Sequence, residues 1–470
     1  MPPPQSAETL LQLLQHFIKH RIQVKQIHAH VITRSLLSQD PFSKWKPTLF
    51  YNTLMRGYVS FGHTRHTCRL FKLMLAHQIP PNAHSFPSLI KAAGLCCAFR
   101  GAISLHGQAL RRGLLADPFV PTSLVGMYSL FGDGVGARKV FDEILSPGVF
   151  EYNAIIDAYA KNGDVGSALV MFETMRQRDV VTWTSVINGF AKNGLFREAI
   201  LFFKDMMVHD DVLHGSVRPN EATYVSILSS CASLDCGALV LGRQIHGYMI
   251  RNELCFTVFM GTALADLYGK LGFLDKAVLV FNTIVFKEVC TWNALISAFA
   301  NNGREKEAIH MFEKMIKVEG LHPNEVTFVA LLTACARAEL VEYGLKLFQS
   351  MQNEFKVVPR LEHYGCLVDL MGRAGLLGEA SDFIDGMPCE PDGSVLGSLL
   401  SSCTIHGEMR LGHEVGQKLI ELQPQYSGRY VALSNINACV GRWDLAAYAR
   451  RVMVEAGIQK IPAYSWTYAK

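Results

Sequence analysis

Apolar and polar positions follow a helical period through most of the chain, and the pattern repeats. Within residues 149–161 the apolar positions recur at spacings of three and four: Tyr152, Ile155, Ile156 and Tyr159. Such spacing predicts a helix with one apolar face. The pattern returns 31 residues later, where Asn193-Gly194 aligns with Asn162-Gly163. A fixed offset of this size indicates an internal repeat.

Each repeat is expected to contain two helices. Gly163 can adopt the left-handed conformation that ends the first helix, and Asp164 offers a side-chain oxygen that caps the second. The second helix carries its own apolar stripe: Val165, Ala168, Leu169, Phe172 and Met175. Two isolated helices cannot bury both stripes, so the repeats must stack on one another. The sequence therefore predicts an all-α fold, an α-solenoid of helix-turn-helix repeats.

The repeats divide most of the chain into units of 31 to 41 residues. The array is predicted to occupy residues 48–392 in ten units: 48–82, 83–117, 118–148, 149–179, 180–220, 221–257, 258–288, 289–324, 325–360 and 361–392. The longest unit contains a polar insertion, His209 to Ser216, which we predict to be a surface loop after the second helix. Residues 393–460 form two further repeat-like units, and residues 461–470 form a tail.

Residues 1–47 are expected to contain a partial repeat. Residues 7–40 have a helical pattern with only two acids, which also fits an organellar targeting segment. The segment is poor in Arg and Ser for that role, and its KQIHA at 25–29 echoes GRQIH at 242–246. The echo favours the partial repeat.

Composition indicates a chain that folds throughout, but it does not identify the binding partner. Apolar residues make up 49% of the chain and charged residues 18%, so we expect the chain to fold throughout. The net charge of +4 is too small to indicate nucleic acid by itself, although it is compatible with a local basic groove. No apolar run reaches the roughly 18 residues of a membrane span.

The chemistry of catalysis is not evident in the sequence. The twelve cysteines include no CxxC pair, which argues against a zinc ribbon and favours small buried thiols in a reducing compartment. His406-Gly407-Glu408 and Pro388-Cys389 resemble parts of a zinc deaminase signature, but their order is reversed and Asp392 stands where a second cysteine is needed. Phosphate loops, GxSxG elbows and HExxH pairs do not occur. We expect no catalytic residue, metal or cofactor.

The units resemble plant pentatricopeptide repeats, in which ordinary, long and short repeats alternate. A long unit reads TYVSILSSCASLDCGALVLGRQIHGYMIRN, a short one TALADLYGKLGFLDKAVLVFNTI, and a terminal short one EHYGCLVDLMGRAGLLGEASDFIDGMPCEPD. Residues 393–460 resemble the carboxy-terminal extension of the E subgroup. The resemblance implies a right-handed superhelix that binds single-stranded RNA, one base per unit.

Two departures from the family pattern bear on this interpretation. Between Asp40 and Pro47 the family usually has a complete short repeat, and only a few residues stand there in this chain. The sequence ends at Lys470, where many relatives continue into a cytidine deaminase-like domain. The resemblance then implies that a deaminase is supplied by another protein.

In the family, the fifth and last residues of a unit face the base. The ordinary units pair Asn52 with Asn82, Asn153 with Asp179, Thr184 with Asn220, and Asn293 with Asn324. By the family's code these pairs resemble readers of a pyrimidine, uracil, adenine and a pyrimidine. Thr122 with Gly148 and Thr262 with Glu288 are poor or ambiguous readers. Any such Asn or Thr, viewed alone, is also an ordinary helix cap.

The expected function is recognition of a site for C-to-U editing in organellar RNA, with residues 393–460 recruiting a deaminase or an accessory protein. Splicing, processing or stabilisation of a transcript would use the same surface. The organelle is expected to be the mitochondrion, with the chloroplast as the alternative. A protein-binding scaffold of tetratricopeptide type is a further alternative, but its units would keep a length near 34 residues and show that motif's Trp-Leu-Gly-Tyr pattern.

Overall fold

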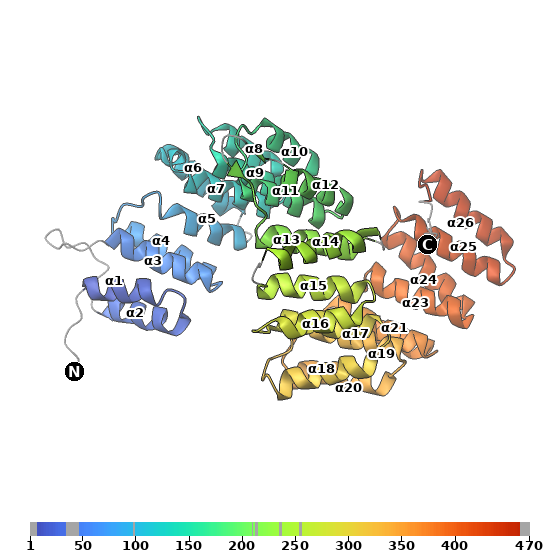
Figure 1. Ribbon diagram of the computed structural model, residues 1–470. Coiled ribbons are helices and arrows are strands. Elements are labelled where there is room, and N and C mark those ends of the chain that lie inside the picture. The colour runs from blue at the N-terminus through green and yellow to red at the C-terminus, as the bar shows by residue number, and fades with distance from the viewer. Residues whose placement is uncertain are drawn as a thin grey trace. The chain divides into compact units, whose positions relative to one another are not determined.

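The computed structural model describes residues 7–33, 47–96, 99–208, 210–211, 215–234, 237–252 and 256–460 (Figure 1). These residues form helices joined by short turns, with one pair of two-residue strands. The predicted all-α class of helix-turn-helix repeats is confirmed. The chain divides into two compact units, residues 1–230 and 231–470, and the division falls within helix α13. The expected tail at 461–470 lies outside the described residues.

The first compact unit, residues 1–230, begins with a helix pair that precedes the predicted array of repeats. Its helices are α1 (Ala7–His16), α2 (Arg21–Thr33), α3 (Pro47–Ser60), α4 (Thr64–Ala76), α5 (Phe86–Leu95), α6 (Phe99–Arg111), η1 (Leu114–Ala116, a 3-10 turn), α7 (Phe119–Leu130), α8 (Gly134–Asp142), α9 (Val149–Lys161), α10 (Val165–Thr174), α11 (Val180–Lys192), α12 (Phe196–Val208) and α13 (Glu221–Ser233).

The second compact unit, residues 231–470, continues the alternation of first and second helices. Its helices are α14 (Gly237–Arg251), α15 (Val258–Lys270), α16 (Leu274–Thr283), α17 (Val289–Asn301), α18 (Glu305–Lys317), α19 (Glu325–Arg337), α20 (Val341–Asn353), α21 (Leu361–Arg373), α22 (Leu377–Asp385), α23 (Gly393–His406), α24 (Met409–Leu422), α25 (Ser427–Cys439) and α26 (Trp443–Glu455). Each predicted interval of the array thus holds one helix pair.

First helices of successive repeats lie side by side. The order of packing in the first compact unit (residues 1–230) is α3, α5, α7, α9 and α11. In the second compact unit (residues 231–470) it is α15, α17, α19, α21 and α23. The second helix of a repeat packs against its own first helix and against the next one, as α10 does with α9 and α11. In the second unit one hydrophobic cluster extends without a break from Phe281 to Ile436. A shared core of this kind makes each repeat depend on its neighbours.

The close spacing of first helices requires small residues where they meet. A Cβ atom added to Gly189 in α11 would lie 2.7 Å from the Cβ of Ala160 in α9. Gly163, which follows α9, has a φ of 83° and takes the left-handed conformation predicted for the turn. In the next helix Asp164 accepts a hydrogen bond from the backbone of Ser167 at 3.0 Å, as expected of a cap.

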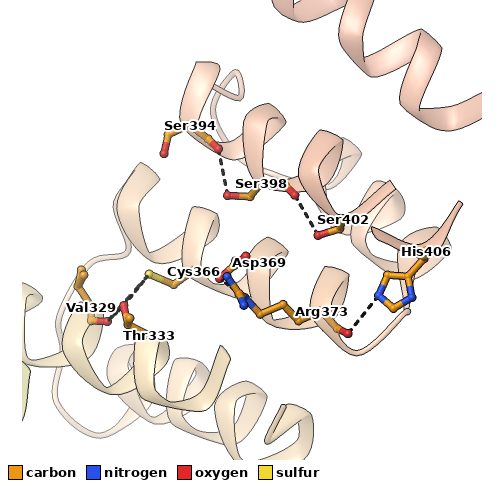
Figure 2. Close-up of polar contacts among 9 residues, drawn as sticks. All are labelled: Val329, Thr333, Cys366, Asp369, Arg373, Ser394, Ser398, Ser402 and His406. Atoms are coloured by element: carbon orange, nitrogen blue, oxygen red, sulfur yellow. Dashed lines mark hydrogen bonds and ion pairs between the residues drawn. The ribbon is translucent and has the colours of Figure 1, made fainter. Parts of the chain in front are cut away.

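The carbonyl ends of the first helices are joined by side chains of the following repeat. Asn193 donates to the Ala160 carbonyl at 2.8 Å, and Asn302 donates to the Gly269 carbonyl at 2.8 Å. His406 does the same to the Arg373 carbonyl at 3.1 Å, as Figure 2 shows. The last carbonyls of a helix have no partner within it, so these donors stabilise helix ends while linking repeats.

A hydrogen bond between a second-helix histidine and a tyrosine of the next first helix recurs at three places in the described part of the chain. His28 in α2, His106 in α6 and His246 in α14 each place Nδ1 next to a tyrosine hydroxyl of the following first helix: Tyr58 at 2.7 Å, Tyr128 at 3.0 Å and Tyr268 at 2.8 Å. Burial is the largest factor that lowers the pKa of His28 and of His246. These two rings are therefore neutral near pH 7 and can share a proton with the hydroxyl.

The insertion in the 180–220 unit contains more order than the predicted loop. Strands β1 (Asp210–Asp211) and β2 (Gly215–Ser216) pair antiparallel, with Asp210 opposite Ser216. Backbone pairing gives a polar surface segment partners for its N–H and C=O groups. His209 and residues 212–214 lie outside the described residues.

The contact at Gly189 leads to a test of the helix spacing. We expect Gly189→Ala to destabilise the protein by about 1–3 kcal/mol, because the added methyl group forces α11 away from α9. Urea unfolding followed by circular dichroism measures the change. Gly126→Ala in α7 is the matched control, since no atom lies within 4 Å of its added Cβ. It should leave stability unchanged or raise it by up to about 1 kcal/mol. Equal midpoints for both variants would contradict the close contact.

Candidate functional site

A side-chain network caps the start of first helices. At α11, Asp179 Oδ1 accepts hydrogen bonds from the backbone N–H and the hydroxyl of Thr182, each at 2.8 Å. The backbone N–H of Asp179 in turn donates to Thr182 Oγ1 at 3.3 Å. Helix N–H groups without partners are satisfied in this way. The last residue of one unit is therefore a cap for the next unit's first helix.

The fifth residue of the preceding first helix joins the same network. Asn153 in α9 donates through Nδ2 to Asp179 Oδ1 at 3.3 Å. The predicted pair is thus in direct contact, across the boundary between two repeats. Asn153 Oδ1 is buried and has no hydrogen-bond partner among the described residues. An unpaired buried acceptor is rare in proteins, and it distinguishes Asn153 from Asn52 and Asn293, whose Oδ1 atoms have donors.

Two other predicted pairs have the same arrangement. Asn52 Nδ2 donates to Asn82 Oδ1 at 3.0 Å, and Asn293 Nδ2 donates to Asn324 Oδ1 at 2.9 Å. In these two pairs the fifth residue is also bound on its oxygen. Ser85 donates to Asn52 Oδ1 at 2.6 Å, and Thr327 donates to Asn293 Oδ1 at 2.7 Å.

The fourth pair is connected through a third side chain. Thr184 and Thr223 place their hydroxyl oxygens 2.7 Å apart. Thr223 donates to Asn220 Oδ1 at 3.0 Å through its hydroxyl, and again at 3.0 Å through its backbone N–H. Threonine is shorter than asparagine, so Thr184 reaches Asn220 only through Thr223.

The short units do not bring their predicted residues together. Thr122 donates to the Pro118 carbonyl of its own helix at 2.8 Å, and Gly148 has no side chain to offer it. Thr262 lies 2.9 Å from the hydroxyl of Thr291, and it makes no hydrogen bond with Glu288 in the described part of the chain. These two positions share the fold of the ordinary units without their polar pair.

The residue that sequence reasoning missed is the third residue of each unit. It is polar in seven units and at most 7% exposed: Ser85, Glu151, Thr182, Thr223, Thr291, Thr327 and His363. In six of them, all but Thr291, the side chain accepts a hydrogen bond from the backbone N–H of the last residue of the preceding unit, as Thr327 does from Asn324 at 3.1 Å. A polar residue three positions after the unit end in seven of the ten units was the available signal.

The fifth and last residues differ in exposure. The fifth residues are nearly buried, at 8% for Asn52, 9% for Asn153 and Thr184, and 5% for Asn293. Asn82 and Asp179 are exposed, and Asn220 and Asn324 are half-buried. Oδ1 of each of these four last residues is hydrogen-bonded, and its other terminal atom makes no hydrogen bond within the described residues. That free atom is a carboxylate oxygen in Asp179 and an NH₂ donor in the three asparagines.

Exposed apolar side chains border the polar pairs. They occupy the second residue of six units, one position away from the buried third residue: Leu49 at 39% exposed, Phe119 at 63%, Phe150 at 76%, Val181 at 47%, Phe259 at 56% and Val326 at 56%. Exposed apolar side chains thus recur at one register of the repeat in both compact units. Such recurrence is typical of a binding surface.

The cysteines and the histidine considered for metal or nucleophilic chemistry are buried in the core or bonded to the backbone. Among the described residues, no three of His, Cys, Asp and Glu converge as a metal would require. Burial raises the pKa of Cys231 to about 12 and the pKa values of Cys335 and Cys403 to about 11, so these thiols stay protonated. His406 is bound to the Arg373 carbonyl. The described helices include none that is both long and apolar enough to cross a bilayer.

Comparison with known proteins gives consistent matches along the chain. The PPR repeat family matches residues 178–233 and 287–337, a single PPR repeat matches residues 50–79, 152–180, 262–288 and 326–354, and the E motif matches residues 406–468. The E motif match overlaps α24–α26.

Several Arabidopsis thaliana proteins are similar over nearly the whole chain. One pentatricopeptide repeat-containing protein is 50% identical over 460 residues, which cover 98% of this chain and 97% of the relative. The chloroplastic protein ELI1 is 41% identical, with 99% of this chain and 75% of the relative covered. A mitochondrial relative is 38% identical, with 88% and 67% covered. The crystal structure of maize PPR10 is 17% identical with a TM-score of 0.45, covering 97% of this chain and 75% of that chain.

The third-residue network can be tested by a single substitution. Thr327→Val has nearly the same shape, but it leaves Asn293 Oδ1 without a donor and the Asn324 N–H without an acceptor. We expect a loss of about 1–3 kcal/mol in stability. Thr327→Ser keeps the hydroxyl and should cost no more than about 0.8 kcal/mol for the lost methyl group. Urea unfolding of both variants measures the difference, and equal stabilities would show that the hydroxyl is not part of the network.

Proposed function

Because the chain belongs to the pentatricopeptide repeat family and carries its E motif, we propose that it binds single-stranded organellar RNA and selects sites for C-to-U editing. One observation carries the proposal. In three ordinary units the predicted fifth and last residues form hydrogen-bonded pairs at the start of the following first helix, and exposed apolar side chains recur at the second residue of six units. A regular row of polar pairs and apolar faces suits a polymer of bases.

The free atom of each last residue gives a physical account of base choice. The outward carboxylate oxygen of Asp179 can accept a hydrogen bond from the N3–H of uracil. The outward NH₂ group of Asn220 can donate to N1 of adenine, and Asn82 and Asn324 can donate to N3 of a pyrimidine such as cytosine. A change of the last residue between aspartate and asparagine exchanges the acceptor offered to the base for a donor, while the cap stays the same.

The second residues supply the contact with the base face. Val181 and Phe150 flank the uracil and adenine units and are 47% and 76% exposed. Base stacking on apolar and aromatic side chains contributes about 1–3 kcal/mol per base and does not depend on base identity. Affinity is therefore spread over many units, while the polar pairs provide the selectivity.

If the units run from the amino end to the carboxy end along RNA from 5′ to 3′, the recognised pattern is pyrimidine, two unread bases, U, A, two unread bases and a pyrimidine. The unread positions correspond to the long and short units. Their fifth residues include Pro87, Val225 and Thr122. Thr122 lacks a paired side chain, which supports its exclusion.

The editing role is proposed from the carboxy-terminal helices. The E motif covers residues 406–468, and family resemblance assigns to residues 393–460 the recruitment of a deaminase or an editing accessory protein. The protein itself would select the RNA site and would supply no catalytic residue. Relatives are named as chloroplastic and as mitochondrial, which supports an organelle. We propose the mitochondrion, with the chloroplast as the alternative.

Base selection can be tested with a random pool of single-stranded RNA. Wild-type protein should enrich U-A at the predicted spacing from the flanking pyrimidines. Thr184→Asn creates an Asn–Asn pair with Asn220 and should replace the adenine preference by a pyrimidine preference at that position alone. We expect a shift of about tenfold or more, which corresponds to about 1.4 kcal/mol. Deep sequencing of the bound fraction measures it.

Thr122→Ala is the matched control for this experiment. Thr122 occupies the same fifth position but bonds only within its helix, so its removal should leave the selected pattern unchanged. If wild-type protein enriches no pattern at moderate salt, where phosphate contacts are screened, base reading by these residues is wrong. A protein scaffold would then be the better hypothesis.

The editing role predicts a defect in living tissue. In a plant line that lacks the protein, at least one organellar cytidine downstream of the recognised pattern should remain unconverted. No other RNA-binding protein would bring the deaminase to that cytidine. Sequencing of organellar transcripts measures conversion at every cytidine. Return of the wild-type chain should restore conversion, and a chain lacking residues 407–470 should bind RNA without restoring it. Complete editing together with mis-spliced transcripts would instead assign the protein to splicing.

A further inference from the structure

Positive charge is concentrated in the first quarter of the chain. Residues 1–116 contain fourteen Lys and Arg residues and only two acids, Glu8 and Asp40. The whole chain has 45 Lys and Arg against 41 Asp and Glu, which leaves 31 basic and 39 acidic residues in 117–470. The net charge of +4 is therefore the sum of a segment at +12 and a segment at −8. The acid-poor segment extends through α1–α6, so its charge belongs to folded helix pairs.

The basic side chains of this segment are exposed and unpaired. All eleven that the structure describes are exposed: Lys19, Arg21, Lys25, Arg56, Arg65, Arg69, Lys72, Lys91, Arg100, Arg111 and Arg112. In the described structure none of them is in an ion pair with a carboxylate. Later helices differ, since Arg138, Lys270 and Arg373 each pair with an aspartate four residues away. The early charges are thus free to attract an anionic partner.

Some of these residues gather at one place in the first unit. Lys19, His20, Arg21 and Lys25 line an open hollow of about 690 Å³ at the turn between α1 and α2. His63 and His66, at the start of α4, lie beside it with ring centroids 5.5 Å apart. Burial lowers the pKa of His63, and the charges of Arg21, Lys25 and His66 lower it further. We call these six residues the N-terminal basic cluster; α1–α4 carry it (Figure 1, blue end).

The cluster is held on a packed frame. Tyr58 in α3 stacks on His66 with their planes 12° apart, and it is hydrogen-bonded to His28 at 2.7 Å. Gly57 in the same helix lies against Ile18 and Val24, so the α1–α2 turn rests on α3. Cations fixed on such a frame lose less conformational entropy on binding than those of a free tail.

We propose that the N-terminal basic cluster binds RNA phosphates without regard to base sequence, and holds the strand on the 5′ side of the bases that the units read. The inference rests on the proposed RNA-binding function and adds a second kind of contact to it. The ordinary units contribute hydrogen-bonding pairs and apolar faces, and the cluster contributes cations gathered at one turn. Phosphate contacts at one end of the strand position it while the base contacts specify it.

The test compares two fluorescent single-stranded RNAs. One is the predicted pattern alone, and the other carries six additional 5′ nucleotides of arbitrary sequence. Wild-type protein should bind the extended RNA more tightly, and Arg21→Gln with Lys25→Gln should remove most of that gain. The slope of log K against log salt for the extended RNA should become shallower by about 1.4, because each single-strand phosphate contact contributes about 0.7.

Arg197→Gln with Lys204→Gln is the matched control. Both residues are exposed on α12, so the variant loses the same charge at a distance from the cluster. It should keep the gain from the 5′ extension and the salt slope. An equal effect of the two variants, or no gain from the extension in wild-type protein, would overturn the proposal.

The outcomes separate this inference from the proposed function. Loss of preference for the pattern, with the gain from the 5′ extension retained, would contradict base reading but leave the basic cluster as an RNA-binding site. Preference for the pattern without any gain from the extension would contradict the cluster alone. Binding to vesicles that contain anionic phospholipid, abolished by the Arg21 and Lys25 substitutions and accompanied by no gain on RNA, would assign the cluster to a membrane surface instead.

Discussion

The hydrogen bonds at the start of each first helix determine most of what this molecule can do. Backbone N–H groups in the first turn of a helix need acceptors, and the last residue of the preceding unit provides one where it is Asp179, Asn220 or Asn324. In the ordinary units the fifth residue of that preceding unit donates to the same oxygen, directly or through a threonine. Helix capping, repeat stacking and the orientation of a possible base contact are therefore one interaction. Because the cap occupies Oδ1, only the second terminal atom is free to vary between aspartate and asparagine.

The opposite ends of the first helices follow a complementary rule. There the groups without partners are carbonyls, and Asn193, Asn302 and His406 of following repeats donate to them. Polar contacts thus lie at the two ends of the first helices, while apolar stripes fill the space between. Of the connection after α12, only its last residue, Asn220, takes part in these contacts, and the strand pair lies before it. This explains why the 180–220 unit can contain a strand pair without disturbing its neighbours.

The repeat period, the turns and the fold class could be predicted because they depend on local pattern. Asn162-Gly163 ends α9 where the sequence suggests, and Asp164 caps α10. The role of Thr182 could not be predicted, because a threonine three residues after an aspartate is also an ordinary capping box. Its function in joining repeats depends on which helix lies alongside. Likewise, a net charge near zero conceals segments of opposite sign, and their arrangement on helices is needed before a basic cluster can be identified.

The histidine-tyrosine contacts bear on the repeat that the family pattern places between Asp40 and Pro47. His106 and His246 connect the second helix of a long unit to the first helix of the unit after it. His28 makes the same contact with Tyr58, although 30 residues separate the two partners here and 22 separate them in the other two contacts. The helix pair α1–α2 therefore packs on α3 as a long unit packs on its successor. Omission of one repeat need not break such an array, because each interface depends on residues at its own two helices. The unit at 48–82 then follows an intact neighbour, and its Asn52–Asn82 pair is held in the same frame as the pairs farther along.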